Sequence, residues 1–331
     1  MNLTPQALHR EIQATGFSGE SLEKVFRLMR LLDALNSHPF LKTRIALKGG
    51  TALNLFHFDV PRLSMDIDLN YVGAADRDTM LAERPRLEQA VQAVCSREGI
   101  TIKRMPSEDA GGKWRLTYVT PTGGSANLEL DVNFLLRTPL WAPRITRGFP
   151  VGSFQAAPVS VLDPHELAAG KLAALVSRSA NRDVFDGHRL LGSPELDPAR
   201  LRLGFVVYGG INRKDWRTVS PEDVTGDPAT VARDLVPMLR STLAPARGEV
   251  TAWFGKLVAE CRERLAIVLP LRAHEIEFLE QLNGVGRIVP ELLTAEPGMQ
   301  AILRDHPGLR WKALNVKQRF GVAGGDGESA G

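Results

Sequence analysis

Two glycines and two aspartates mark a short segment of this sequence that could do phosphate chemistry. The segment LKGGTALNLFHFDVPRLSMDID begins at Leu47, has Gly49 and Gly50 near its start, and ends with Asp66 and Asp68. Glycines after a strand let the backbone approach a ligand closely, and the amides of a following helix can hold a phosphate. Side chains alternate along a strand, so the two aspartates share one face about 6.5–7 Å apart. This spacing suits a divalent metal such as Mg²⁺, which binds carboxylates and substrate phosphates.

The order of these residues resembles the signature of polymerase-beta-type nucleotidyltransferases, in which GG or GS precedes DxD. The resemblance implies an α/β (α+β) fold whose core contains a mixed sheet. It also implies a third carboxylate from a later strand. The alternating segment LELDVNF places Glu129, Asp131 and Asn133 on one face, and Asp131 is the natural match. The same segment fits an ordinary half-exposed strand, so both interpretations of Asp131 stay open.

A second group of candidate residues lies on a predicted helix. The segment DPHELAAGKLAALVSR, residues 163–178, begins with Asp163 as a capping residue and carries Lys171. The segment RDVFD follows at residues 182–186. The form ELxxxKLxALxxR followed by RDxxD resembles the AbiEii/AbiGii toxins, a family that includes the MenT toxins. The segments LKGGTAL and SMDIDL also fit that family, and the likeness covers residues 40–190 best.

The resemblance implies a role for each candidate residue. Asp186 is the preferred catalytic acid, and Asp183 is the alternative. Ser64 matches a position where these toxins carry Ser or Thr, and its hydroxyl is either a self-modification site or a hydrogen-bonding group at the start of a strand. The remaining implied roles are a phosphate turn at Gly49, Gly50 and Thr51, metal binding by Asp66, Asp68 and Asp131, and a contact from Lys171 to the nucleoside triphosphate.

Several of these residues also have structural interpretations. Lys171 could lie on the surface of its helix. Asp183 and Asp186 could cap the next helix. Arg178 and Arg182 could pair with those acids instead of binding phosphate.

Hydrophobic patterning predicts the elements that must position these groups. Helices are predicted over residues 1–37, with Ser21 as a cap, from residue 51 onward, and over residues 77–98. Residues 137–160 contain no clear helix. Strands are predicted over residues 44–48, 65–72, 100–107, 113–120 and 126–136, the last two joined by a turn at Gly123 and Gly124.

The pattern predicts two domains and a tail. Residues 1–155 are expected to form the nucleotidyltransferase core with its N-terminal helices. Residues 156–320 are expected to form a mainly helical C-terminal domain that contributes a lysine and an aspartate to the site. Residues 321–331, GVAGGDGESAG, are rich in glycine, so we expect a disordered tail.

The composition is typical of a soluble globular protein, with 44% hydrophobic and 24% charged residues. Cys95 and Cys261 lie far apart, which argues against a disulfide framework and against a zinc site. No apolar run reaches the ~18 residues of a membrane helix, and the N-terminus does not resemble a signal peptide. A cytoplasmic protein is therefore expected. His57 and His165 show no metal-ligand spacing and fit ordinary polar positions.

The chain is mildly basic, with a formal net charge of +3. Residues 304–319 contain five arginines and lysines against one acid, Asp305. This segment is either a solvated helix face or a surface that contacts nucleic-acid phosphates.

The family resemblance implies the toxin of a toxin–antitoxin system, with a cognate antitoxin as its partner. It implies a metal-dependent nucleotidyltransferase that moves nucleotides from a nucleoside triphosphate to RNA, with the 3′ end of transfer RNA as the acceptor, and so blocks translation. Two alternatives stay open. The acceptor could be a protein or a small molecule, or the chain could bind nucleotide without turnover. The full set of carboxylates favours turnover.

Overall fold

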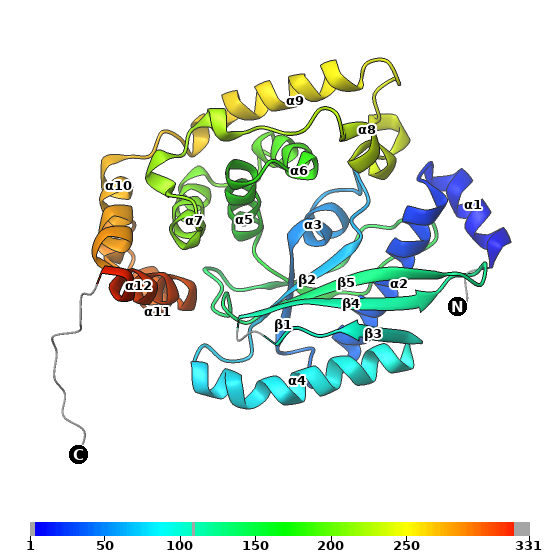
Figure 1. Ribbon diagram of the computed structural model, residues 1–331, viewed down its shortest axis with the longest axis horizontal. Coiled ribbons are helices and arrows are strands. Elements are labelled where there is room, and N and C mark those ends of the chain that lie inside the picture. The colour runs from blue at the N-terminus through cyan, green and yellow to red at the C-terminus, as the bar shows by residue number, and fades with distance from the viewer. Residues whose placement is uncertain (1–3, 108–109, 321–331) are drawn as a thin grey trace.

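Within residues 4–107 and 110–320, which the computed structural model describes, seven strands form one mixed sheet (Figure 1). The strands follow the order β3–β4–β5–β2–β1–β7–β6 across the sheet. Their bounds are β1 Ile45–Lys48, β2 Asp66–Tyr71, β3 Ile100–Arg104, β4 Gly111–Val119, β5 Ser125–Asn133, β6 Arg144–Thr146 and β7 Val159–Val161. The predicted α/β class with a mixed sheet is confirmed.

The strand β2 lies in the middle of the sheet. It runs antiparallel to β1 and parallel to β5. The strands β4 and β5 form a hairpin whose turn includes Gly123 at φ +86°, as the glycine pair predicts. Residues that are far apart in the sequence therefore lie side by side on one face of the sheet.

Helices cover both faces of the sheet. In Figure 1, α4 lies below the sheet, whereas α3, α5, α6 and α7 lie above it. A π-helical turn, Leu53–His57, continues α3. The helices are α1 Pro5–Thr15, α2 Gly19–Ser37, α3 Gly49–Ala52, α4 Arg77–Arg97, α5 Pro164–Ser177, α6 Asn181–Leu191, α7 Pro198–Ile211, α8 Val231–Asp234, α9 Val250–Arg264, α10 Ala273–Glu280, α11 Pro297–Asp305 and α12 Pro307–Phe320.

The face of β2 that packs against α2, with α4 beside it, is apolar. Ile67 and Leu69 are each 1% exposed, and the Tyr71 hydroxyl donates to Glu83 of α4 at 2.7 Å. Fully burying a side chain of this kind contributes about 1.5–3 kcal/mol. Because side chains alternate along a strand, this burial directs the aspartates of β2 to the opposite face, on which α3 lies.

The C-terminal half of the chain holds the loop that precedes β2. The Leu63 amide donates to the Met238 carbonyl at 2.7 Å, and the Arg240 amide donates to the Pro61 carbonyl at 3.0 Å. The Arg240 side chain also donates to the Asp59 carbonyl at 2.9 Å. The position of this loop therefore depends on residues about 180 positions later in the chain.

The N-terminal helical region differs from the prediction in its details. It forms two helices, because α1 ends at Gly16, which has φ +71°, and α2 begins at Gly19. The predicted cap at Ser21 is wrong, since Ser21 lies inside α2 and is buried. Ser18 occupies the position before the helix.

Residues 137–160 contain no helix, as predicted, but they include β6 and part of β7, two strands that the sequence did not predict. The strand β7 pairs in parallel with β1, so the sheet continues beyond residue 155. The division into two domains stays a prediction. The predicted tail, residues 321–331, lies outside the described residues. None of the described helices is long and apolar enough to cross a membrane.

Candidate active site

A glycine corner joins β1 to α3. Gly49 has φ +73°, a conformation that residues with side chains rarely adopt. A Cβ atom at this position would lie 2.1 Å from Oδ2 of Asp68. The backbone of the corner therefore lies directly against the carboxylate, and only glycine fits there.

The start of α3 is tied to β2 and packs on the loop before it. Thr51 Oγ1 donates to the Asp66 carbonyl at 2.5 Å. A Cβ on Gly50 would lie 2.9 Å from Ser64 Oγ. Both Thr51 and Ser64 are buried. The structure thus places the predicted phosphate turn, residues 49–51, next to the strand that carries the predicted metal ligands.

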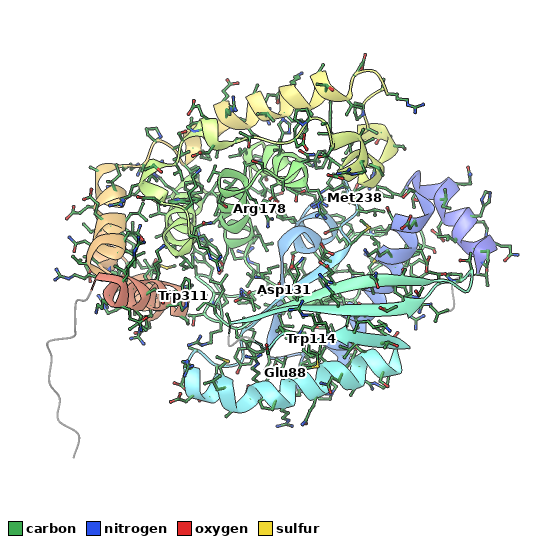
Figure 2. The ribbon with its side chains drawn as sticks, in the orientation of Figure 1. Glu88, Trp114, Asp131, Arg178, Met238 and Trp311 are labelled. Carbon is green, nitrogen blue, oxygen red and sulfur yellow. The ribbon has the colours of Figure 1, made fainter. Side chains whose placement is uncertain are left out.

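Four charged residues form one transverse row across the sheet. The strand register pairs Lys48 of β1 with Asp68 of β2. It pairs Asp68 with Asp131 of β5, and Asp131 with Lys113 of β4. Neighbouring strands are about 4.8 Å apart, so each member of the row is adjacent to the next. Figure 2 shows Asp131 at the sheet, and Arg178 in the helical layer above it.

Asp66 lies in the neighbouring row, opposite Glu129 of β5. Its Oδ2 is 3.9 Å from Nη1 of Arg182, which lies on α6. Lys113 Nζ donates to Glu129 Oε2 at 2.7 Å. Asp66 and Asp68 therefore share a face of β2, as the strand pattern predicts.

Both aspartates of β2 have a raised pKa. Burial disfavours the charged carboxylate and is the largest cause of the raised pKa of Asp66 and of Asp68. Arg182 lowers the pKa of Asp66 and Lys48 lowers that of Asp68, but each offsets only part of this effect. The negative charge of Asp131 raises the pKa of Asp68 further. A bound cation would therefore stabilise these carboxylates.

Lys171 lies at the centre of a second cluster, which is formed by α5 and α6. Its Nζ is 2.9 Å from Asp183 Oδ1 and 2.9 Å from Asp186 Oδ2. Lys171 is 9% exposed, so the alternative of a lysine on the helix surface is wrong. Burial alone would lower the pKa of Lys171, but the two aspartates raise it above its ordinary value. Lys171 is therefore charged at neutral pH, and it lies within electrostatic reach of Asp68.

Asp186 is fully buried and is bound by side chains from the loop before β2 and from the turn after α3. Arg62 Nε donates to Asp186 Oδ1 at 2.7 Å, and Arg62 Nη2 donates to Oδ2 at 2.6 Å. Asn54 Nδ2 donates to Oδ1 at 3.1 Å. Burial would raise the pKa of Asp186, but Arg62 and Lys171 hold it well below its ordinary value. Breaking a buried pair of this kind costs about 3–5 kcal/mol.

Asp183 binds a more exposed partner. Arg178 Nε donates to Asp183 Oδ2 at 2.5 Å, and the Arg178 side chain is 63% exposed. Burial would raise the pKa of Asp183, but Lys171 and Arg178 lower it. Asp183 and Asp186 both lie inside α6, which begins at Asn181, so their interpretation as helix caps is wrong. The pairing of Arg178 with Asp183 matches its structural interpretation.

The helix that carries Lys171 begins as predicted. Asp163 Oδ1 accepts a hydrogen bond from the His165 amide at 2.9 Å, which confirms the cap. His165 Nδ1 is 2.8 Å from the same oxygen, and its Nε2 accepts from the Asp197 amide at 2.9 Å. His165 is therefore an ordinary buried polar residue.

An open pocket of about 670 Å³ lies on the α6 side of Asp66, and its lining does not include the two aspartates of β2, the glycine corner or Lys171. Its lining includes Met65, the residue before Asp66, and Arg182. Ser179 and Arg233 add further polar groups. Ligand pockets are commonly about 300–1,000 Å³, so a nucleotide unit would fit here.

The aspartates of the site fit a hard divalent cation. Asp66 and Asp68 offer carboxylate oxygens on one face, and Mg²⁺ is usually held by one or two carboxylates together with substrate phosphates. Across residues 4–107 and 110–320, no three His, Cys, Asp or Glu side chains are grouped closely enough to hold a metal. The fit is therefore to a site with two protein carboxylates. The role of Asp131 as a third ligand stays a prediction.

The basic segment near the C-terminus is largely engaged within the protein. Arg304 pairs with Glu291 at 2.5 Å, and Arg310 pairs with Asp305 at 2.6 Å. Lys312 Nζ donates to a backbone carbonyl at 2.7 Å. The segment by itself therefore gives no argument for RNA binding.

Sequence reasoning missed four residues of the site. Arg62 and Asn54 hold Asp186, and Lys48 and Lys113 flank the aspartates of the row. Arg62 lies in an irregular loop where no periodicity could have indicated it. Lys48 carried a usable signal, because it ends a predicted strand and directly precedes the glycine corner.

Comparisons with known proteins agree with this geometry. Residues 30–251, more than half of the chain, match the family described as "Nucleotidyl transferase AbiEii toxin, Type IV TA system". The chain is similar to the solved structure of MenT4, a nucleotidyltransferase toxin from Mycobacterium tuberculosis H37Rv, with a TM-score of 0.63 and 18% identity. That match covers 92% of this chain and 100% of the other, and it shows a shared fold. No curated protein sequence is similar enough to count as a relative. This chain therefore belongs to the AbiEii family of nucleotidyltransferase toxins of type IV toxin–antitoxin systems.

Proposed function

We propose that this protein uses Mg²⁺ to transfer a nucleotide from a nucleoside triphosphate to the 3′ end of transfer RNA, and that this transfer blocks translation. The observation that carries the proposal is the position of the acid pair. Asp68 lies directly against the glycine corner and within electrostatic reach of Lys171, so groups suited to metal and to phosphate converge. The choice of acceptor is supported by the resemblance to RNA-modifying toxins and by the partly exposed guanidinium groups of Arg178 and Arg182 near the pocket.

In this proposal the protein contributes mainly positioning and charge. The amides of residues 49–51 bind the phosphates, and Lys171 contacts the triphosphate. Asp66 and Asp68 hold the metal, with Asp131 adjacent. When bound, Mg²⁺ would supply charge stabilisation to the in-line displacement. The acceptor hydroxyl gives up its proton to solvent as its oxygen attacks the α-phosphorus, the bond from the α-phosphorus to the bridging oxygen breaks, and pyrophosphate leaves.

The geometry refines three of the predicted roles. Asp186 is 0% exposed and its carboxylate is bound by Arg62 and Lys171, so we assign it a positioning role. Asp183 is also buried, at 2% exposed, and is bound by Lys171, but its second partner, Arg178, is exposed, so Asp183 lies closer to the surface of the site than Asp186. Ser64 is 6% exposed and packs on the glycine corner, which favours a structural role over self-modification.

The family also implies a cognate antitoxin, and we propose that such a protein counteracts the toxin in the cell.

The proposal is tested by incubating the purified protein with MgCl₂, α-³²P-labelled nucleoside triphosphates and total RNA. Label is expected on RNA of transfer-RNA size. Asp66→Ala should lower the rate at least about 100-fold, because it removes several kcal/mol of charge stabilisation. Asp305→Ala is the matched control, since this aspartate is 66% exposed and pairs with Arg310 on the surface.

Three results would contradict the proposal in different ways. Label found only on a protein or only on a small molecule would show that the acceptor is not RNA. Tight triphosphate binding with no turnover would indicate a binding module. Equal activity of Asp66→Ala and the wild type would remove the acid pair from the mechanism.

A further inference from the structure

The charges around the acid pair are balanced by the protein itself. Four carboxylates lie on this part of the sheet, and four cations of β1, β4 and α6 are in register or paired with them, so these formal charges cancel: Asp66, Asp68, Glu129 and Asp131 against Lys48, Lys113, Arg115 and Arg182. Two of the cations already have a partner. Lys113 is bonded to Glu129, and Arg182 lies near Asp66.

Lys48 is the cation that remains for the centre of the row. It is paired in register with Asp68, and Asp68 is paired with Asp131. Burial lowers the pKa of Lys48, and the negative charges of Asp68, Asp131 and Glu166 offset part of this effect, with Asp68 the strongest of the three. In the described part of the chain the Lys48 side chain has no hydrogen bond and no ion pair within 4 Å, and the strand register places it on the same face of the sheet as Asp68 and Asp131.

A metal at Asp66 and Asp68 would have to share these carboxylates with the Lys48 charge. Two like charges a few ångströms apart in a partly buried site repel each other by several kcal/mol at an effective dielectric constant of about 20. Without a nucleotide, the metal would therefore bind weakly, because the positive charge of Lys48 repels it. A nucleoside triphosphate carries several negative charges and offsets both cations at once.

We propose that Lys48 is a built-in counterion for Asp68 and Asp131, and that the protein consequently takes up its divalent metal together with the nucleoside triphosphate and only weakly without it. This inference rests on the proposed metal-dependent function. It assigns a positioning and specificity role to a residue outside the predicted metal and phosphate ligands.

The test measures Mn²⁺ binding by the electron paramagnetic resonance signal of free Mn²⁺, with and without an α,β-methylene nucleoside triphosphate that cannot be transferred. Wild-type protein should bind Mn²⁺ at least tenfold more tightly with the analogue than without it. Lys48→Met should bind Mn²⁺ alone at least tenfold more tightly than the wild type. Lys48→Gln, which keeps a polar group at this position, is expected to behave in the same way and is measured in parallel.

Two further variants separate charge from simple damage to the fold. Lys103→Met is the matched control, because Lys103 is an exposed lysine on the edge strand β3 of the same sheet, and it should bind Mn²⁺ like the wild type. The double variant Lys48→Met with Asp131→Asn removes one charge of each sign. Its affinity for Mn²⁺ alone should return to within about threefold of the wild type.

The proposal is overturned if wild-type protein binds Mn²⁺ equally well with and without the analogue, or if neither substitution of Lys48 changes that ratio. Label transfer is measured separately on the same samples. Coupled binding without any transfer would leave the role of Lys48 intact and contradict the proposed function. Transfer with unchanged Mn²⁺ affinity in the Lys48 variants would contradict the role of Lys48 alone.

Discussion

The two charged clusters of this protein contain the same residue types but are in opposite electrostatic states. On α6, Asp183 and Asp186 are bound by Lys171 and two arginines, and the pKa of each aspartate is lowered. On β2, Asp66 and Asp68 are only partly compensated, and their pKa values are raised. The paired cluster has little capacity for another cation, whereas the strand cluster has capacity left.

Because of this difference, the two clusters have different roles. The cluster on α6 joins α5, α6 and the loop before β2 through buried hydrogen bonds, so it holds Lys171 in place. In the cluster on β2, burial makes the charged aspartates energetically unfavourable, and a bound metal with its substrate would reduce this unfavourable energy. The following predictions test this contrast, from the largest expected effect to the smallest.

Arg62→Met should cause the largest loss of stability. The substitution leaves Asp186 and Lys171 as an incompletely paired buried group, which costs about 3–5 kcal/mol of the free energy of unfolding. Thermal unfolding followed by circular dichroism measures the effect. Arg233→Met, which removes an arginine that is 76% exposed and pairs with Asp234, should change stability by less than about 0.5 kcal/mol. Similar losses in the two variants would show that the buried cluster has no special structural role.

Asp68→Asn should have the opposite sign and raise the stability of the protein by about 0.5–2 kcal/mol at pH 7, because it removes a charge that burial disfavours. The raised pKa means that the folded state binds a proton more readily than the unfolded state. As the pH falls from 7 through the raised pKa, Asp68 of the wild type becomes protonated and the folded state no longer contains an unfavourable buried charge. The difference in the free energy of unfolding between Asp68→Asn and the wild type should therefore shrink. Urea unfolding at a series of pH values measures this difference.

Asp186→Asn provides the contrasting pH profile. The lowered pKa of Asp186 gives stability that is present above the unfolded value of about 3.9 and is lost as the pH falls through the folded value. Asp186→Asn should therefore be less stable than the wild type at pH 7, with the deficit shrinking only below about pH 4. If both variants changed stability in the same direction at pH 7, the proposed difference between the clusters would be wrong.

Lys113→Met should have the smallest effect. Lys113 is 59% exposed, and its pair with Glu129 is open to solvent, so the interaction is worth less than about 1 kcal/mol. The rate of nucleotide transfer at low substrate concentration should fall by less than about fivefold. A loss of 100-fold would instead place Lys113 in direct contact with the substrate.

The sequence predicted those parts of the site that follow a local rule. Alternation along the strand placed Asp66 and Asp68 on one face, and Asp163 at the start of a helix predicted where Lys171 would lie. These features depend on a few neighbouring residues, so a single sequence contains them. The cap at Ser21 failed because the helix begins two residues earlier, at Gly19, and a second serine, Ser18, occupies the position before it.

The rest of the site depends on pairings between distant residues. Arg62 and Asp186 are 124 positions apart, and nothing near either residue indicates the other. The row from Lys48 to Lys113 exists only because four strands align in one register. The strands β6 and β7 were not predicted, because each has only three residues and is too short to show an alternating pattern.

The hydrogen bond from Leu63 to Met238 has a consequence for the order in which the site is completed during synthesis. The loop before β2 is held in place by Met238 and Arg240, which the ribosome adds about 180 residues after that loop. A nascent chain that stops short of Met238 lacks that support, and one that stops short of Asp186 also lacks the partner of Arg62. The loop before β2 therefore acquires all of these contacts only after residues as late as Arg240 have been synthesised.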